Sequence, residues 1–283
     1  GEPKRLAMIS GLGLGLGNLA ATLIFLAIAL LFVLPAAIGW PFAIPQFGVD
    51  LSKFEHARLA GPICAVWLAV FSIPFFLNAR DPGVPGASWT RAFRDGAVSV
   101  WRTLRAATHY RELMKFLVAR MFYADGMAAL LALGAVYVAL FLGWNFLEML
   151  CYAIFASACA FAGGLIGGWL ESKVGVKRAL LVEIMLMVLA GLTQLSITRE
   201  SPFLGLIENS QVWDGPVFQT LSDIVYLSLI SVVAITVTAS ISSGRTMLVT
   251  LAPPGRSGEF FGLYAIAGTI TVWMGPLLVE QFT

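Results

Sequence analysis

The sequence has little charge for its length. Asp, Glu, Lys and Arg make up 12% of its 283 residues, whereas a soluble domain carries about 25% of these residues. Hydrophobic residues make up 59%, and the mean hydropathy is +0.86. So little charge cannot cover the surface of a soluble enzyme of this size, which excludes that class of protein.

Chemically reactive patterns are also scarce. The three cysteines, Cys64, Cys151 and Cys159, lie within apolar stretches and form no CxxC or Cys/His cluster, so we interpret them as small packing residues. The sequence contains no HExxH or GxSxG pattern, and we therefore expect neither an enzyme nor a bound cofactor or metal. A net charge of +2 without a basic stripe argues against nucleic acid as a partner.

What is abundant is continuous apolar sequence in blocks of about 20 residues, the length that a helix needs to cross about 30 Å of hydrocarbon. The blocks are too long for barrel strands of about ten residues, and Pro, Gly or clustered charges separate them. The sequence therefore predicts an all-α integral membrane protein with about seven transmembrane helices. The predicted spans are Leu6 to Leu34, Leu59 to Leu77, Phe116 to Leu142, Phe146 to Leu170, Ala179 to Ile197, Ile224 to Ser243, and Phe260 to Val279.

The positions of Lys and Arg predict how the chain crosses the membrane, because short basic loops stay in the cytoplasm. Fourteen of the 18 basic residues fall on one side of seven alternating crossings, three fall on the other side, and Arg120 lies inside a span. The N-terminus is therefore predicted to be cytoplasmic. The compact loops and the excess of Arg over Lys favour a bacterial inner membrane, with a vacuolar membrane as the alternative.

The longest predicted cytoplasmic segment, residues 80–115, changes in composition. It begins with Asp-Pro-Gly-Val-Pro-Gly and continues as an amphipathic helix, with Phe93 and Trp101 on its apolar side and Arg91 and Arg94 on its basic side. Such a helix is expected to lie along the inner membrane surface, or simply to connect two helix bundles. The predicted domains are residues 1–79, the connector 80–115 and residues 116–283. The chain begins with Gly-Glu-Pro rather than Met, and we expect it to be a fragment.

Two charged residues lie in the third predicted span, where an ionisable group costs roughly 2.5–3.5 kcal/mol. Arg120 is five residues inside Lys115, so its long side chain can reach back to the cytoplasmic interface. Asp125 is too short to do so, and a rise of about 15 Å from Lys115 places it near the midplane. The two charges point about 140° apart on a helix and are poor direct partners. Asp125 is either a functional carboxylate or a polar contact between helices.

Polar and small residues in other spans are weaker signals. Ser228, Ser231, Thr238 and Ser242 follow one another at helical spacing up to Arg245, and this stripe either lines a water-filled path or makes ordinary interhelical hydrogen bonds. Glu183 lies close to the predicted interface and is interpreted as structural. The run Gly11, Gly13, Gly15 and Gly17 forms two GxxxG pairs, which predict close helix approach rather than a nucleotide-binding loop.

A short predicted cytoplasmic loop carries a recognisable pattern. The segment from Gly168 to Arg178 resembles the GxxxDRxGxRR loop of the major facilitator superfamily, with matches at Gly168, Lys173, Gly175, Lys177 and Arg178. Ser172 stands where the family has an acid, and Glu171 stands one residue earlier. The glycines allow a tight turn, and the basic residues hold it at the anionic inner leaflet.

Two longer stretches make the resemblance more specific. They are Phe116-Leu-Val-Ala-Arg-Met-Phe-Tyr-Ala-Asp-Gly126, and the segment from Gly244-Arg245 through Pro253-Pro-Gly-Arg256 and Glu259 to Gly275-Pro276. Together they resemble the vacuole-effluxer branch of the superfamily, whose fungal members export amino acids from the vacuole during autophagy. The resemblance implies that the seven spans are helices five to eleven of twelve. Residues 1–79 would end an N-terminal bundle, and 116–283 would form a C-terminal bundle without its last helix.

The resemblance also implies a function, namely proton-coupled transport of a small polar solute, with amino acids as candidates, by alternating access. Asp125, Arg120 and Tyr123 would bind substrate or protons, together with the hydroxyl stripe from Ser228 to Ser242. Arg245, Arg256 and Glu259 would belong to a cytoplasmic gate with the loop that holds Glu171. The expected partners are the solute, the lipid bilayer and the missing N-terminal helices. A membrane sensor or scaffold and a channel are the alternatives.

Overall fold

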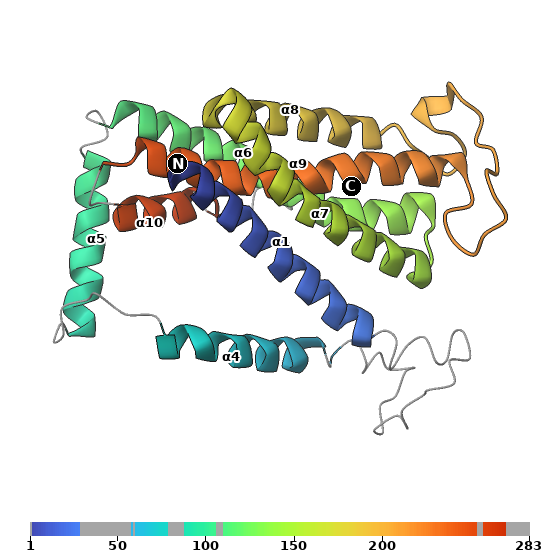
Figure 1. Cartoon of the computed structure of the whole chain (residues 1–283). Helices are drawn as coiled ribbons and strands as arrows, with labels where there is room; N and C mark the ends of the chain where they lie inside the picture. Colours follow the sequence, from blue (N-terminus) through green and yellow to red (C-terminus); the bar gives the residue numbers. More distant parts are fainter. Residues whose placement is uncertain are drawn as a thin grey trace. The chain divides into compact units, whose positions relative to one another are not determined.

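A computed structural model describes residues 2–28, 58, 60–78, 88–105, 110–253 and 257–269. The chain divides into two units, one of residues 1–19 and 92–283 and one of residues 20–91. Its helices, labelled in Figure 1, are α1 (Glu2–Ile28), α4 (Ala60–Asn78), α5 (Trp89–Arg105), α6 (Arg111–Tyr137), α7 (Phe146–Val174), α8 (Val176–Gln194), α9 (Leu221–Leu251) and α10 (Ser257–Ala267). Two short helices, η3 (Val138–Leu142) and η4 (Phe203–Gly205), also lie in the described part of the chain.

The described residues confirm the all-α fold class, because the only β pairing among them is an isolated bridge between Gln211 and Thr220. Four helical segments in this part of the chain are long and apolar enough to cross a membrane: Gly61–Asn78, Arg111–Leu142, Leu147–Val174 and Leu221–Leu251. Four of the seven predicted spans are therefore found. The first predicted span contributes a shorter apolar stretch, Leu12–Ile24, and its residues 29–34 lie outside the described ones.

The fifth and seventh predicted spans are helical, but their lengths differ from the expectation. Helix α8 has Lys177 and Arg178 in its first turn and Glu183 inside it, so its uninterrupted apolar part is short. Helix α10 is described only up to Ala267, and Gly268 and Thr269 form a turn after it. The count of seven membrane crossings stays a prediction.

Local sequence signals fix the ends of the two longest α-helices. Helix α6 continues through η3 and stops at Gly143, whose φ of +69° favours glycine. Asn145 then caps α7, because its side chain accepts a hydrogen bond from the Glu148 N–H at 3.0 Å while the Glu148 carboxylate accepts one from the Asn145 N–H at 2.8 Å. Thr220 and Asp223 form the same kind of capping box at the start of α9.

Helix α9 is longer than predicted at its C-terminal end. The predicted span ends at Ser243, whereas the helix continues to Leu251 and ends two residues before Pro253. Gly244 and Arg245 do not interrupt it, since a single glycine costs a helix only about 1 kcal/mol. Proline lacks an N–H group and stops it.

The best-packed part of the first unit is a triplet of helices, α7, α8 and α9 (Figure 1). Two glycines of α7 let the backbones of α7 and α9 approach closely. A Cβ atom on Gly163 would lie 2.4 Å from the carbonyl oxygen of Ile235, and one on Gly167 would lie 2.8 Å from the Cβ of Ala239. Only glycine fits at either place. This GxxxG pair was not singled out from the sequence.

The predicted glycine run in α1 serves close packing at one position. A Cβ atom on Gly15 would lie 2.9 Å from the ring of Phe161 in α7, whereas Gly13 and Gly17 have nothing within 4 Å of such an atom. Close approach is therefore found at Gly15 among the described residues, and for the pair of Gly13 and Gly17 it stays a prediction.

Helices α4 and α5 differ in character. The long apolar side chains described on α4 are exposed all around it, from Val66 to Leu77, as expected for a helix that contacts lipid or other helices. The connector forms helix α5 as predicted, and Phe93 and Trp101 are 81% and 56% exposed. Arg91, Arg94 and Arg102 are also exposed. This arrangement fits an amphipathic helix, and its position on the membrane surface stays a prediction.

Candidate functional site

Arg120 of α6 lies among aromatic side chains. Its Nη1 donates a hydrogen bond to the hydroxyl of Tyr123 at 3.1 Å, and its Nε donates to the carbonyl of Tyr264 in α10 at 3.4 Å. The guanidinium carbon lies 3.6 Å from the centroid of the Tyr264 ring. The expectation that Arg120 reaches back toward the start of its helix is therefore wrong, since Tyr123 lies three residues further along the span. Stacking on a tyrosine ring offsets the loss of water around the cation.

The Tyr264 carbonyl explains why a cation is stabilised here. It belongs to the last turn of α10, where the helix dipole favours positive charge, and it also accepts a hydrogen bond from the Gly268 N–H at 3.2 Å. Gly268 follows this turn, and a Cβ atom there would lie 2.9 Å from Arg120 Nη2. The cluster of Arg120, Tyr123, Tyr264 and Gly268, which we call the arginine cage, therefore joins α6 to the end of α10.

Asp125 lies on another side of α6. Its side chain is half-buried, and its Oδ1 atom is buried without a hydrogen-bond partner among the described residues. The bonding partners of Arg120 are the two tyrosines, which confirms that the two charges of this span are not direct partners. A buried carboxylate oxygen without a partner is costly, so this position has unused capacity to accept a hydrogen bond.

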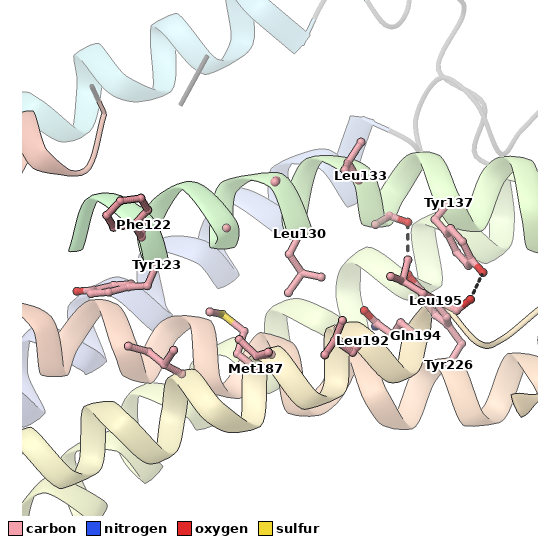
Figure 2. A pocket seen from close by; sticks show the side chains of 16 residues that line it. Phe122, Tyr123, Leu130, Leu133, Tyr137, Met187, Leu192, Gln194, Leu195 and Tyr226 are labelled. Carbon is pink, nitrogen blue, oxygen red and sulfur yellow. Dashed lines mark hydrogen bonds between the residues drawn. The ribbon is translucent and has the colours of Figure 1, made fainter. Parts of the chain in front are cut away.

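A cavity of about 400 Å³ opens between α6 and α8 (Figure 2). Phe122, Tyr123, Leu130 and Leu133 line it from α6, and Met187 and Leu192 line it from α8. Its lining is mostly apolar, with Gln194 and the hydroxyls of Tyr137 and Tyr226 at one end. Of the predicted substrate or proton sites, Tyr123 lines this cavity, whereas Arg120, Asp125 and the α9 hydroxyls do not.

The predicted polar stripe of α9 divides into two parts. Ser228 is exposed and Ser231 half-buried, and both hydroxyls donate to carbonyls of their own helix, at Ile224 and Ser228. Thr238 and Ser242 are buried, with 5% and 1% exposure. The middle of the stripe lies against α7, because Gly163 abuts the backbone of Ile235.

The cytoplasmic loop motif forms a tight reversal between α7 and α8. Gly175 ends one helix and begins the next with a φ of +84°, so it needs glycine. Lys173, Lys177 and Arg178 are exposed around it, where they can contact anionic lipid. Gly168 was expected to belong to the turn, but it lies inside α7, because this helix extends to Val174.

Glu171 of this motif turns inward. Only 8% of the residue is exposed, and its carboxyl lies against the hydroxyls of Ser243 and Thr246 in α9. Ser243 donates a hydrogen bond of 2.9 Å to Oε1 of Glu183 in α8, which is 2% exposed. Neither the role of Ser243 nor the proximity of the two acids was predicted from the sequence. The signal that the sequence offered was Glu183 itself, an acid inside an otherwise apolar helix.

The predicted gate residues are only partly described. Arg245 is exposed on α9, and Glu259 is half-buried in the first turn of α10. Arg256 lies outside the described residues.

Long apolar helices, with an arginine cage and buried carboxyls among them, are typical of an integral membrane protein. A family model described as "Vacuole effluxer Atg22 like" matches residues 2–281. The chain therefore belongs to the vacuole effluxer Atg22-like family.

Relatives occur in a bacterium and in fungi. The chain is 24% identical over 284 residues to an uncharacterized MFS-type transporter, YxiO, of Bacillus subtilis, covering 98% of this chain and 56% of the relative. It is 23% identical to Autophagy-related protein 22 of Coccidioides immitis and 27% identical to Autophagy-related protein 22-1 of Aspergillus clavatus, covering 97% and 96% of this chain and 43% of each relative. The chain thus spans about half the length of these relatives. No solved structure matches it.

Proposed function

We propose that the protein carries a small polar solute, with amino acids as the first candidates, across a membrane by alternating access coupled to protons. Membership of the vacuole effluxer Atg22-like family supports transport. The observation that carries the solute class is the arginine cage. Arg120 is half-buried in a helix long enough to span the membrane, and no carboxylate of the described residues pairs with it.

Arg120 would bind the negative end of the solute. A guanidinium has five N–H donors, and two of its nitrogens donate to Tyr123 and to the Tyr264 carbonyl. The remaining donors suit the fork of a carboxylate. Because Arg120 links α6 to the end of α10, binding of an anion there would change the contact between these helices, as alternating access requires.

Asp125 would bind the coupling proton. It lies five residues beyond Arg120 on α6, and its buried Oδ1 has no hydrogen-bond donor among the described residues. The Asp125→Asn variant keeps the shape of the side chain and cannot release a proton. In vesicles that contain the full-length protein, we expect uptake of labelled amino acids under an imposed pH gradient to fall to the level of empty vesicles. Counterflow of labelled against unlabelled solute should continue, because exchange needs no net proton movement.

The matched control is Asp214→Asn, at an exposed acid of the loop before α9. It should leave both fluxes unchanged. If Asp125→Asn kept full gradient-driven uptake, the proposed role of Asp125 would be wrong. Flux that saturates poorly and shows no counterflow would indicate a channel, and no flux in the wild type would favour a sensor or scaffold.

A further inference from the structure

We propose that Glu171 and Glu183 form a proton-binding carboxyl pair, distinct from Asp125, inside the triplet of α7, α8 and α9. The two acids come from different helices and lie against one hydroxyl, that of Ser243. Each carboxyl also has one buried oxygen, Oε1 of Glu171 and Oε2 of Glu183, with no hydrogen-bond partner in the described part of the chain. This inference does not depend on the protein being a transporter.

The two hydroxyls that lie against the pair, those of Ser243 and Thr246, do not supply a donor to every carboxyl oxygen. The hydroxyl hydrogen of Ser243 goes to Glu183 Oε1 at 2.9 Å. Thr246 touches Glu171 but also donates to the carbonyl of Ser242 at 3.3 Å. Glu171 and Glu183 can complete this arrangement if one of them carries a hydrogen of its own, since a protonated carboxyl is a donor.

Charge leads to the same conclusion. Two carboxylates that share a buried site cannot both be ionised without strong repulsion, so such a pair binds one proton as a unit. The basic residues on the helices of the triplet are all exposed, whereas both acids are buried. These basic residues are Lys173, Lys177, Arg178 and Arg245. Further charged groups lie on the adjoining helices α6 and α10. Arg120 of α6 is held by tyrosines, Asp125 lies on α6, and Glu259 lies on α10.

The surroundings of the pair are closely packed. Gly167 of α7 lies directly against Ala239 of α9, and a Cβ atom on Gly167 would lie 3.5 Å from Glu183 Oε1. Ser242 and Ser243 are 1% and 0% exposed. A proton fits such a site without displacing a helix, and its loss at high pH would place two negative charges between α7 and α8.

Glutamine tests the proposal because it has the shape of a protonated glutamate. The variants are Glu171→Gln, Glu183→Gln and the double variant, with Glu200→Gln at an exposed loop position as the matched control. Thermal unfolding of the detergent-solubilised chain is measured from about pH 6 to about pH 9. We expect the wild-type midpoint to fall by several degrees as the pH rises, and each single glutamine variant to lose this fall. The control should keep it. Equal falls in the wild type and both single variants would overturn the proposal.

Infrared spectroscopy gives a second measurement that does not depend on the stability of a variant across pH. At neutral pH the wild type should show the carbonyl stretch of a protonated carboxyl, shifted in heavy water. The double variant should lose a band equal to one carboxyl per chain, and Asp125→Asn should keep that band. An unchanged band in the double variant would overturn the proposal of a proton-binding carboxyl pair. A negative result in the transport test of Asp125 would not affect this proposal. Recovery of the high-pH midpoint by sodium ions would overturn the assignment to a proton.

Discussion

Two regions of the molecule hold polar groups inside apolar helices by different means. In the triplet of α7, α8 and α9, glycines bring backbones together and hydroxyls contact the buried acids. In the arginine cage, tyrosine rings and the end of α10 surround a cation. The close contacts of the triplet are made by backbone atoms, which cannot shift unless a whole helix moves. The contacts of the arginine cage are made by the outer parts of side chains. The difference indicates that the triplet is the rigid part of this unit and that the contact between α6 and α10 can change.

The largest effect should come from closing the glycine contact of the triplet. In Gly163→Ala the new Cβ would lie 2.4 Å from a backbone oxygen of Ile235, so α7 and α9 must separate. We expect the free energy of unfolding in detergent to drop by about 2 kcal/mol, because overpacking costs more than the alanine gains in helix propensity. Gly126→Ala is the control, since a Cβ there meets nothing within 4 Å. A similar loss in both variants would contradict the rigid-triplet interpretation.

A smaller effect should follow from changing the cation of the cage. Arg120→Lys keeps the charge but loses the planar group that stacks 3.6 Å above Tyr264. Because lysine cannot reproduce the stacking and the forked hydrogen bonds, we expect a loss of about 1 kcal/mol in unfolding free energy. Chemical unfolding of the detergent-solubilised chain measures it, with Arg111→Lys at the exposed start of α6 as the control. Equal stability of both variants would show that the cage adds nothing beyond charge.

The smallest effect is expected at Gly244, where α9 meets the cage. A Cβ atom there would lie 2.6 Å from the hydroxyl of Tyr264 and 2.9 Å from that of Tyr123. These atoms end side chains that can shift, unlike the backbone at Gly163. We expect Gly244→Ala to change the unfolding free energy by less than about 0.5 kcal/mol, since the gain in helix propensity offsets the displacement. A loss as large as that of Gly163→Ala, measured in the same way, would remove the contrast between the two regions.

Sequence reasoning located most helices because hydrophobicity and helix-ending residues act locally. The breaks at Gly143 and Gly175 and the connector helix α5 follow from single residues or from periodicity within one segment. It misplaced the C-terminal end of α9, since the helix continues past Gly244 to Leu251, two residues before the proline. It also placed Gly168 in a turn, although the helix before Gly175 includes it.

The candidate site was predictable only in part. Arg120 and Asp125 stood out because charge is rare in a span, and their separate surroundings followed from helical rotation alone. The direction of the Arg120 side chain could not be predicted in this way, since it depends on Tyr264, a residue 144 positions away. The meeting of Glu171, Glu183 and Ser243 has the same cause, as these residues come from three helices.

The sequence by itself determined that this protein is helical and belongs in a membrane, and which of its residues are costly to bury. Both properties are sums over neighbouring residues, and the cost of a charge in hydrocarbon does not depend on the fold. The tertiary structure decided which of those costly residues meet one another. The physical reason is that helical periodicity tells which side chains share a face, whereas the choice of the facing helix depends on contacts such as those of Gly163 and Gly167, made between segments far apart in the chain.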